Sequence, residues 1–294
     1  MLRALAALLA ALATGGSGWQ LSAIDESNIP PVVVQDAAQV EIAVVDTGAD
    51  LTVPELATRA PTTYDVRTKT ANVRDPNGHG TFVTSIAAAY SGEARLLVIR
   101  AGSASGAFTD DAEAAAIRYA IAHGARIINL SIGGPTTSKV ERAAIRFAVT
   151  HGALVVTAAG NDHGMGNPVE YPAALVQPVG SNGSGGTGLV VGAAADGIRA
   201  PFSGSGSWIS LAAPGVDVYG ALRSGRYGYS SGTSFAAAEV SGAAALVWAA
   251  DPALTAQQVA GILEKTASGH GTWTPDLGWG VVDVAAAVAV ALQS

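Results

Sequence analysis

Short apolar runs alternate with amphipathic or alanine-rich segments along most of the chain. Each apolar run stops at a turn of polar residues or glycine, a pattern typical of buried parallel strands. We expect strands over residues 40–45, 95–100, 126–130, 153–159, 189–195 and 208–213. The segments between and after them predict one helix that opens after 75–81 and further helices over 112–123, 140–151, 235–250, 252–266 and 281–292.

Two neighbouring units of this pattern are near copies of each other. Residues 117–125 read IRYAIAHGA and residues 145–153 read IRFAVTHGA, and in both a helix stops at a glycine before a strand begins. Successive strand–helix–strand units imply a parallel sheet with right-handed crossovers. The sequence therefore predicts an α/β fold.

Polar residues follow three of the expected strands directly. Asp46, Ser131 and Asn161 each come after a different strand. In an open parallel sheet the functional crevice lies at the carboxyl ends of the strands. We therefore expect these three side chains to lie together at a functional site.

The helix expected over 235–250 has one charged residue, Glu239, and is otherwise apolar or small, so it should be buried nearly all round. A turn of small residues ending at Ser234 precedes it. The first turn of a helix has free backbone N–H groups and a positive dipole end, which suits a hydroxyl that must become a nucleophile. On this stretch alone, the simpler interpretation is that Ser231 or Thr233 is only an N-cap.

Composition narrows the possible functions. The chain has 294 residues and no linker-like stretch, and its 49% apolar and 13% charged residues suit one compact domain. A net charge of −7 without a Lys/Arg block argues against a nucleic acid or an anionic membrane as partner. The absence of cysteine excludes disulfides, thiolate metal sites, a cysteine nucleophile and a lipoprotein anchor.

Residues 1–13 have the pattern of a signal peptide, with Arg3, an apolar run and a small-x-small cleavage site. This predicts a secreted or periplasmic protein, and the alternative is that the run forms a first helix of the fold. Residues 14–39 are then expected to be an N-terminal extension and residues 40–294 a single domain. No later run resembles a transmembrane span, since the closest candidate, 235–250, is short and interrupted by a charge and glycines.

The five histidines all precede a glycine, so their positions in the predicted elements have to distinguish them. His123 and His151 fall in the last turns of helices, a favourable place for a partly cationic side chain. His79 falls at the start of a helix, where the dipole disfavours the cation. A neutral imidazole is what a general base needs. His163 and His270 fall in loops, and no role is assigned to them.

Acyl transfer needs a nucleophile, a base, a carboxylate that orients the base, and donors for the developing oxyanion. Ser234, His79, Asp46 and Asn161 could fill these roles, in the chain order Asp, His, Ser. The segments 44–48, 78–81 and 232–237 resemble the three signature blocks of the subtilisin-like serine proteases. Residues 158–161 resemble the oxyanion segment of that family, and the similarity extends over about 41–287.

The resemblance implies a three-layer, doubly wound sandwich around a mostly parallel sheet, and a secreted serine endopeptidase that acts on polypeptides. It implies that Asp46 orients His79, that His79 deprotonates Ser234, and that the Asn161 amide and the Ser234 N–H bind the oxyanion. It also implies an extended segment that pairs with the substrate backbone and a facing wall of the specificity pocket. These substrate-binding residues are Ser131, Ile132, Gly133, Ala158, Ala159 and Gly160.

Two features depart from the family pattern. Phe235 and Ala238 stand where the family usually has Met and Pro, which affects helix packing more than catalysis. The segment before Asp46 is also short for the folded pro-domain with which family members are commonly made. This second departure leaves open a catalytically silent binding protein with the same fold.

A third class, a nucleotide-dependent oxidoreductase, depends on residues 183–188, which match G-x-G-x-x-G. The match lacks a strand before it and a helix after it, so we expect a surface loop instead. We assign no cofactor and no metal. Aspartate-rich loops such as Asp110-Asp111 could bind calcium, but solvated surface is the expected state. We expect a monomer.

The family also suggests that the Tyr171–Pro172 bond is cis. Glu170 precedes this turn, where the family more often has a small or neutral residue at the pocket floor. An acid in the pocket would favour substrates with Lys or Arg. The sequence favours the alternative that Glu170 points to solvent and leaves small-residue walls at Ala158 and Gly133, suited to large apolar side chains.

Overall fold

The computed structural model describes residues 28–294 and contains an eight-stranded sheet in the order β2-β3-β1-β4-β5-β6-β7, with β8 also paired to β6. All pairs are parallel except β6–β7. The strands are β1 (Glu41–Asp46), β2 (Thr62–Asp65), β3 (Arg95–Arg100), β4 (Ile127–Leu130), β5 (Leu154–Ala158), β6 (Leu189–Ala195), β7 (Ile198–Arg199) and β8 (Leu211–Pro214). The first strand is central, with β3 on one side and β4 on the other, which is the arrangement of a doubly wound sheet.

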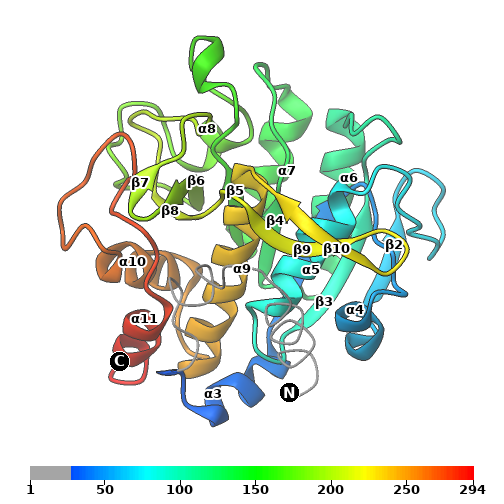
Figure 1. Ribbon diagram of the computed structural model, residues 1–294, viewed down its shortest axis with the longest axis horizontal. Coiled ribbons are helices and arrows are strands. Elements are labelled where there is room, and N and C mark those ends of the chain that lie inside the picture. Colours follow the sequence, from blue (N-terminus) through cyan, green and yellow to red (C-terminus); the bar gives the residue numbers. More distant parts are fainter. Residues whose placement is uncertain (1–27) are drawn as a thin grey trace.

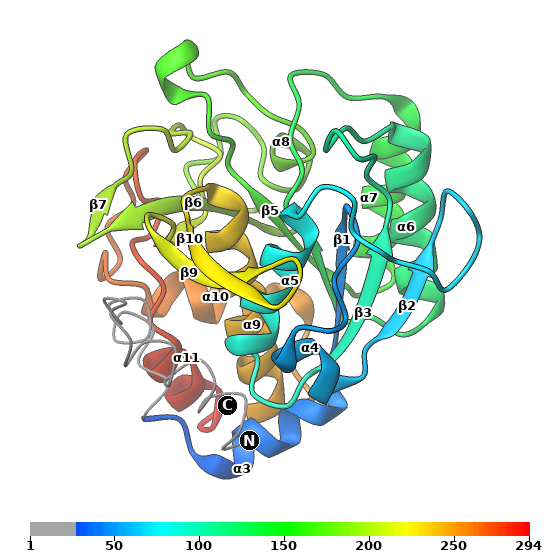
Figure 2. The same ribbon diagram turned by 45° about the vertical axis from the view of Figure 1, so that its right-hand side comes forward.

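Helices cover both faces of this sheet, as Figures 1 and 2 show. Helices α5 (His79–Ala89) and α9 (Thr233–Ala250) pack on one face, and α6 (Asp110–Ala122), α7 (Lys139–Thr150) and α8 (Ala173–Val176) pack on the other. Successive strand side chains point to opposite faces. Val44 therefore belongs to one buried core and Val45 to the second. The predicted three-layer α/β sandwich is confirmed.

Helix α9 is the centre of one layer and contacts β1, β4, β5, β6 and β8. Every residue from Thr233 to Ala249 is buried, including Glu239, as the sequence predicted. By length and composition alone the helix could cross a membrane, but 94% of it is enclosed by the rest of the fold. Its apolar sequence is thus explained by its place in the core.

Both ends of the described chain pack near the lower end of α9 (Figures 1 and 2). Helix α3 (Pro31–Asp36) contacts α9, and Ile29, Val33 and Ala37 join the core with the C-terminal helices. These helices are α10 (Ala256–Thr266) and α11 (Val284–Ala291), and a 3-10 turn η2 (Ala37–Gln39) leads into β1. Residues 28–39 of the expected N-terminal extension therefore pack into the fold, while the expected signal peptide, 1–13, lies outside the described residues.

Several short elements were not predicted. They are α3, η2, α4 (Pro54–Arg59), β2, β7, η3 (His163–Met165), α8 and the hairpin of β9 (Val218–Leu222) and β10 (Arg226–Ser230). The hairpin sequence is rich in glycine and polar residues, and one face of it packs against α5. Such segments become regular only because a neighbouring element covers them. The strand expected over 208–213 begins later, at Leu211, because a turn bonded from Ile209 N–H to the Gly206 carbonyl precedes it.

Candidate active site

Asp46 and His79 meet at the carboxyl end of β1. Asp46 is the last residue of that strand and His79 is the first residue of α5. The His79 Nδ1 atom lies 2.8 Å and 3.0 Å from the two carboxylate oxygens of Asp46, whose side chain is 1% exposed. The Thr47 N–H also donates to Asp46, at 2.7 Å. A buried carboxylate held in this way fixes the orientation of the imidazole.

A second buried carboxylate, Asp75, organises the loop that leads into α5. One oxygen accepts hydrogen bonds from the Thr47 hydroxyl and from the N–H groups of Asn77 and Gly78, at 2.8–3.0 Å. The other accepts from the N–H and the hydroxyl of Thr81, at 2.8 Å and 2.6 Å. Sequence reasoning treated this stretch only as a helix start. The signal that could have identified Asp75 is its place at the head of an Asp-Pro-Asn-Gly turn.

The ionisation of His79 is controlled by these two aspartates. Burial lowers the pKa of His79, but the charge and hydrogen bond of Asp46 and the charge of Asp75 outweigh burial, so the pKa is raised above 6.5. The helix dipole alone predicts a neutral ring. The structure corrects this prediction, because the nearby carboxylates have the larger effect on the pKa of His79.

Ser234 lies in the first turn of α9 and is 7% exposed. Its Oγ lies 3.5 Å from the Ser131 carbonyl oxygen and, within residues 28–294, makes no hydrogen bond to His79. The Ser131 hydroxyl donates to the Ser234 carbonyl at 2.8 Å, which ties the helix start to the end of β4. The N-cap of α9 is Gly232, without a side-chain bond, so the interpretation of Ser231 or Thr233 as the N-cap is wrong.

Asn161 follows β5 and faces the same helix start. Its Oδ1 atom accepts from the Thr233 N–H at 3.0 Å and from the Thr233 hydroxyl at 3.1 Å. These two bonds leave the Nδ2 amide without a partner among the described residues. The side chain is thus anchored at its oxygen, and its donor group is available at the cavity beside Ser234.

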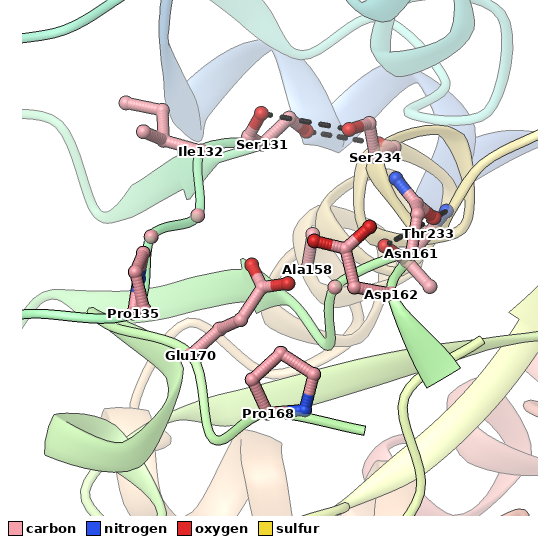
Figure 3. A pocket seen from close by; sticks show the side chains of 13 residues that line it. Ser131, Ile132, Pro135, Ala158, Asn161, Asp162, Pro168, Glu170, Thr233 and Ser234 are labelled. Atoms are coloured by element: carbon pink, nitrogen blue, oxygen red, sulfur yellow. Dashed lines mark hydrogen bonds between the residues drawn. The ribbon is translucent and has the colours of Figure 1, made fainter. Parts of the chain in front are cut away.

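A cavity of about 370 Å³ lies between the 131–135 segment, the end of β5 and the first turn of α9 (Figure 3). The structure brings Ser131, Ile132, Gly133, Ala158, Gly160, Asn161 and Ser234 to its lining, as expected from the sequence. Ala159 is an exception. It is fully buried in the core on the opposite face of the sheet from Ala158, because successive side chains alternate along β5.

Glu170 also lines this cavity, which overturns the expectation that it points to solvent. It is 8% exposed, and its carboxylate lies between Gly133 and Gly160, so closely that a methyl group added to either glycine would overlap it. Burial and the negative charge of Asp162 raise the pKa of Glu170 to about 6. The Tyr171–Pro172 bond that follows is cis, as predicted, and Tyr171 exchanges two backbone hydrogen bonds with Gly134.

A second cavity, of about 570 Å³, lies on the other side of the 131–134 segment and includes His79 in its lining. It contains Glu113 and Glu141. Burial, with the charges of Glu141 and Asp110, raises the pKa of Glu113 to about 8. Glu113 is therefore mostly uncharged at neutral pH, in contrast to Glu170.

Comparison with known proteins identifies the family of the chain. The model of the subtilase family matches residues 37–280, which is more than half of the chain. The chain belongs to the subtilase family. The residues named above as a possible nucleophile, base and orienting carboxylate all lie within the matched part.

Individual relatives show how far the similarity extends. The thermophilic serine proteinase of Bacillus sp. (strain AK1) is 35% identical over 82% of this subtilase and 60% of the relative. The subtilisin of Bacillus pumilus is 33% identical, over 85% of this chain and 91% of the relative. A crystal structure of a cold adapted subtilisin-like serine proteinase matches with a TM-score of 0.73 and 27% identity, over 85% of this chain and 90% of the other.

The chain thus spans 60% of the length of the first relative and 91% of the second. The family and these relatives support one catalytic class, serine-type endopeptidase.

The glycine-rich stretch 183–188 of the subtilase lies in the turns between α8 and β6. The Gly183 carbonyl accepts a hydrogen bond from the Trp279 indole at 2.8 Å. A strand follows the stretch where a dinucleotide site would need a helix, so its interpretation as a loop is confirmed.

Residues 28–294 include no group of three or more His, Cys, Asp or Glu side chains arranged to hold a metal ion. Asp110 and Asp111 lie in the first turn of α6, where the helix dipole favours acidic side chains. This explains their position without a cation, and calcium stays unassigned.

Proposed function

We propose that this subtilase is a secreted endopeptidase that hydrolyses peptide bonds of polypeptides through an acyl-enzyme on Ser234. The observation that carries the proposal is the contact of 2.8 Å between His79 Nδ1 and the buried Asp46 carboxylate. That contact leaves the other ring nitrogen, Nε2, to act as a base. Ser234 is placed at the start of the neighbouring helix α9, whose Phe235 ring lies 6.0 Å from the His79 ring.

In the proposed mechanism the Ser234 hydroxyl attacks the carbonyl carbon of the substrate while His79 Nε2 accepts the hydroxyl proton. Asp46 accepts the Nδ1–H bond and stabilises the imidazolium. His79 then protonates the leaving amine, and an acyl-enzyme remains. Water attacks the acyl group with His79 again as the base, which releases the acid and restores Ser234. His79 and Ser234 form no hydrogen bond to each other within residues 28–294, and in serine enzymes this bond often becomes well aligned only in the complex with substrate.

We assign the oxyanion to two donors, the Asn161 Nδ2 amide and the Ser234 N–H. Neither donor has a hydrogen-bond partner within residues 28–294. Ser234 lies in the first turn of α9, and Asn161 faces that turn from the end of β5. Unused donors beside a nucleophile can bind charge that develops in the transition state.

The segment from Ser131 to Gly133 is proposed to pair with the substrate backbone. The N–H and carbonyl groups of Ile132 and Gly133 form no backbone–backbone hydrogen bond to any residue of 28–294. Gly134, the next residue, is already paired with Tyr171. Free extended backbone next to a strand end can accept a peptide as an added strand.

Labelling by a fluorophosphonate, together with hydrolysis of an unstructured polypeptide, tests the proposal. We expect stoichiometric labelling of the parent and no labelling and almost no turnover for Ser234→Ala. His79→Ala should also lose almost all turnover. A folded parent protein that neither reacts nor hydrolyses would instead support the catalytically silent alternative, which the relatives do not favour.

The pH dependence gives a second check. His79 must be neutral to act as a base, and its pKa is raised above 6.5. The rate should therefore increase with pH through neutrality and level off once the ring is deprotonated. A rate that does not change between about pH 5 and pH 9 would rule out His79 as the base.

Export is proposed from the signal-peptide pattern of residues 1–13 alone. Expression of the whole chain, followed by mass measurement of the protein outside the cytoplasm, should find a product without these residues. The monomeric state and the absence of nucleic-acid and membrane partners remain predictions.

A further inference from the structure

The cavity beside Ser234 has a carboxylate on its inner side. Figure 3 shows Glu170 extending into the cavity, with Ser234 across from it and Ala158 between them. Glu170 is 8% exposed as a whole residue, so most of its surface is removed from water. Gly133 and Gly160, on the two walls, leave the space that the carboxylate occupies.

No group of the described chain neutralises this carboxylate. Within residues 28–294, Glu170 has neither an ion pair nor a side-chain hydrogen bond. The lining includes a second carboxylate, Asp162, and no Lys, Arg or His. The guanidinium of Arg142 lies over the ring of Tyr171, 5.7 Å from its centroid, and is not part of the lining. The cavity is therefore negatively charged when Glu170 is ionised.

A buried, unpaired carboxylate is costly for the protein, and an incoming cation would remove that cost. The rise of the pKa of Glu170 to about 6 reflects the same cost, and at neutral pH the group is still mostly ionised. An apolar side chain entering the cavity would leave the carboxylate dry and unpaired. An acidic one would add a third negative charge.

The position of the cavity identifies the part of the substrate that would enter it. Ser234 and Asn161 both line the cavity, and the attacked carbonyl must lie between these two groups. The side chain attached next to that carbonyl is then the one nearest to Glu170. A lysine or arginine has the length to reach inward, with its apolar stem along the walls.

We propose that Glu170 makes Lys or Arg the preferred residue on the acyl side of the cleaved bond. This inference depends on the proposed endopeptidase function, because it concerns the same site. Glu170 selects the substrate through a charge-assisted hydrogen bond and takes no part in the proton transfers. The small-residue walls alone would instead suggest a preference for apolar side chains.

The test compares peptides that are identical except for the residue before the cleaved bond, which is Lys, Arg, Leu, Gln or Glu. We expect kcat/KM to be higher for Lys and Arg than for Leu by tenfold or more, and lowest for Glu. Glu170→Gln keeps the shape and removes the charge, and it should lower the Lys-to-Leu ratio by roughly 10- to 100-fold. Asp111→Asn, an equal charge change at the exposed start of α6, is the matched control and should leave the ratio unchanged.

The ratio should also fall in the parent as pH decreases through about 6, the pKa of Glu170. Protonation of His79 affects both peptides equally and cancels in the ratio. Apart from Glu170, Asp162 is the ionisable residue in the cavity lining. The Lys-to-Leu ratio of Asp162→Asn is therefore measured in parallel. Equal Lys-to-Leu ratios in the parent and Glu170→Gln would overturn the proposal, as would a preference removed by Asp162→Asn and retained by Glu170→Gln.

Binding of benzamidine, a small cation, separates this inference from the proposed function. We expect benzamidine to raise the melting temperature of the parent and of Ser234→Ala, but to have little effect on Glu170→Gln. Such binding without peptide hydrolysis would refute the proposed function and leave the cation pocket standing. Hydrolysis without any difference between the parent and Glu170→Gln in benzamidine binding would refute the pocket alone.

Discussion

Asp75 and Glu170 are two carboxylates buried beside the same site, at 3% and 8% exposure, and their surroundings differ. Asp75 accepts five hydrogen bonds from the protein, two of them from hydroxyls. The Glu170 carboxylate accepts none from residues 28–294 and faces a cavity. The satisfied carboxylate supports structure around His79, and the unsatisfied one is available to a ligand.

The difference follows from the energetics of buried charge. A carboxylate with several N–H and O–H donors keeps most of the stabilisation that water would give it, whereas an unpaired one does not. Proteins keep such unfavourable groups mainly at functional sites. The two carboxylates should therefore respond differently to substitution.

The largest expected effect is that of Asp75→Ala. This change leaves five donors near His79 without their acceptor, and each buried donor without a partner is destabilising. We expect a loss of about 3–5 kcal/mol in the free energy of unfolding, measured with urea. Asp111→Asn is the control for a surface aspartate. A loss below about 1 kcal/mol would show that Asp75 has no special structural role.

Asn161 has one polar atom with partners and one without. Its Oδ1 accepts two hydrogen bonds from Thr233, whereas its Nδ2 has no partner within residues 28–294. Asn161→Ala should lower kcat by about 10²–10³-fold with little change in KM, since an oxyanion donor acts mainly in the transition state. This magnitude is carried over from subtilisin, a relative of this chain. Steady-state kinetics on a single peptide measures it, and an unchanged kcat would remove Asn161 from the site.

Two glycines probe the packing in the two regions, Gly80 beside the Asp46–His79 pair and Gly133 beside Glu170. A methyl group at Gly80, next to the Asp46–His79 pair, would overlap the backbone carbonyl of Gly48, which cannot move aside. The atoms nearest to a methyl group at Gly133 would be those of the Glu170 side chain, whose carboxylate can move aside. We expect Gly80→Ala to cost about 1–3 kcal/mol of unfolding free energy and Gly133→Ala less.

The cost of Gly133→Ala should decrease further when Glu170→Ala is combined with it, while the cost of Gly80→Ala should not. A double-mutant cycle by urea unfolding measures both couplings. Independent behaviour of the Gly133 and Glu170 changes would contradict the contact between them.

The smallest expected effect is on stability at Glu170. Its folded-state pKa is about 6 against 4.5 for the ordinary group, so folding favours the protonated form. That contribution is full below pH 4.5 and is lost as pH rises through 6. Glu170→Gln should therefore be more stable than the parent by about 1–2 kcal/mol above neutral pH, with no advantage in acid.

Urea unfolding of the parent and of Glu170→Gln at several pH values measures this difference in stability. The same substitution should lower the Lys-to-Leu ratio of kcat/KM. A Glu170→Gln variant that is less stable at every pH would show that the carboxylate has partners in the fold, as Asp75 has.

The main features of the site could be predicted because they depend on local signals. Asp46 and Asn161 follow apolar runs that form parallel strands, and His79 and Ser234 stand at helix starts. The carboxyl ends of parallel strands meet at one edge of the sheet, so Asp46, Ser131 and Asn161 are expected to come together. The resemblance to the family then suggested a role for each.

Three features of the site could not be predicted from such local signals. The donors of Asp75 come partly from Thr47, 28 positions away. Ala159 was expected at the pocket, but the alternation of β5 turns it into the opposite core. The raised pKa of His79 depends on carboxylates that the fold brings near it, and the helix dipole alone suggested the opposite direction.

The sequence by itself determined the α/β class, most strands and long helices, and the residues of the proposed triad, because hydrophobic periodicity and short motifs are local properties. Only the tertiary structure decided where Glu170 points. The loop from 162 to 169 has no periodicity, and the direction of the Glu170 side chain that follows it depends on the space left by Gly133 and Gly160. Those glycines come from two other strand ends, so the charge of the pocket is a property of packing rather than of any one segment.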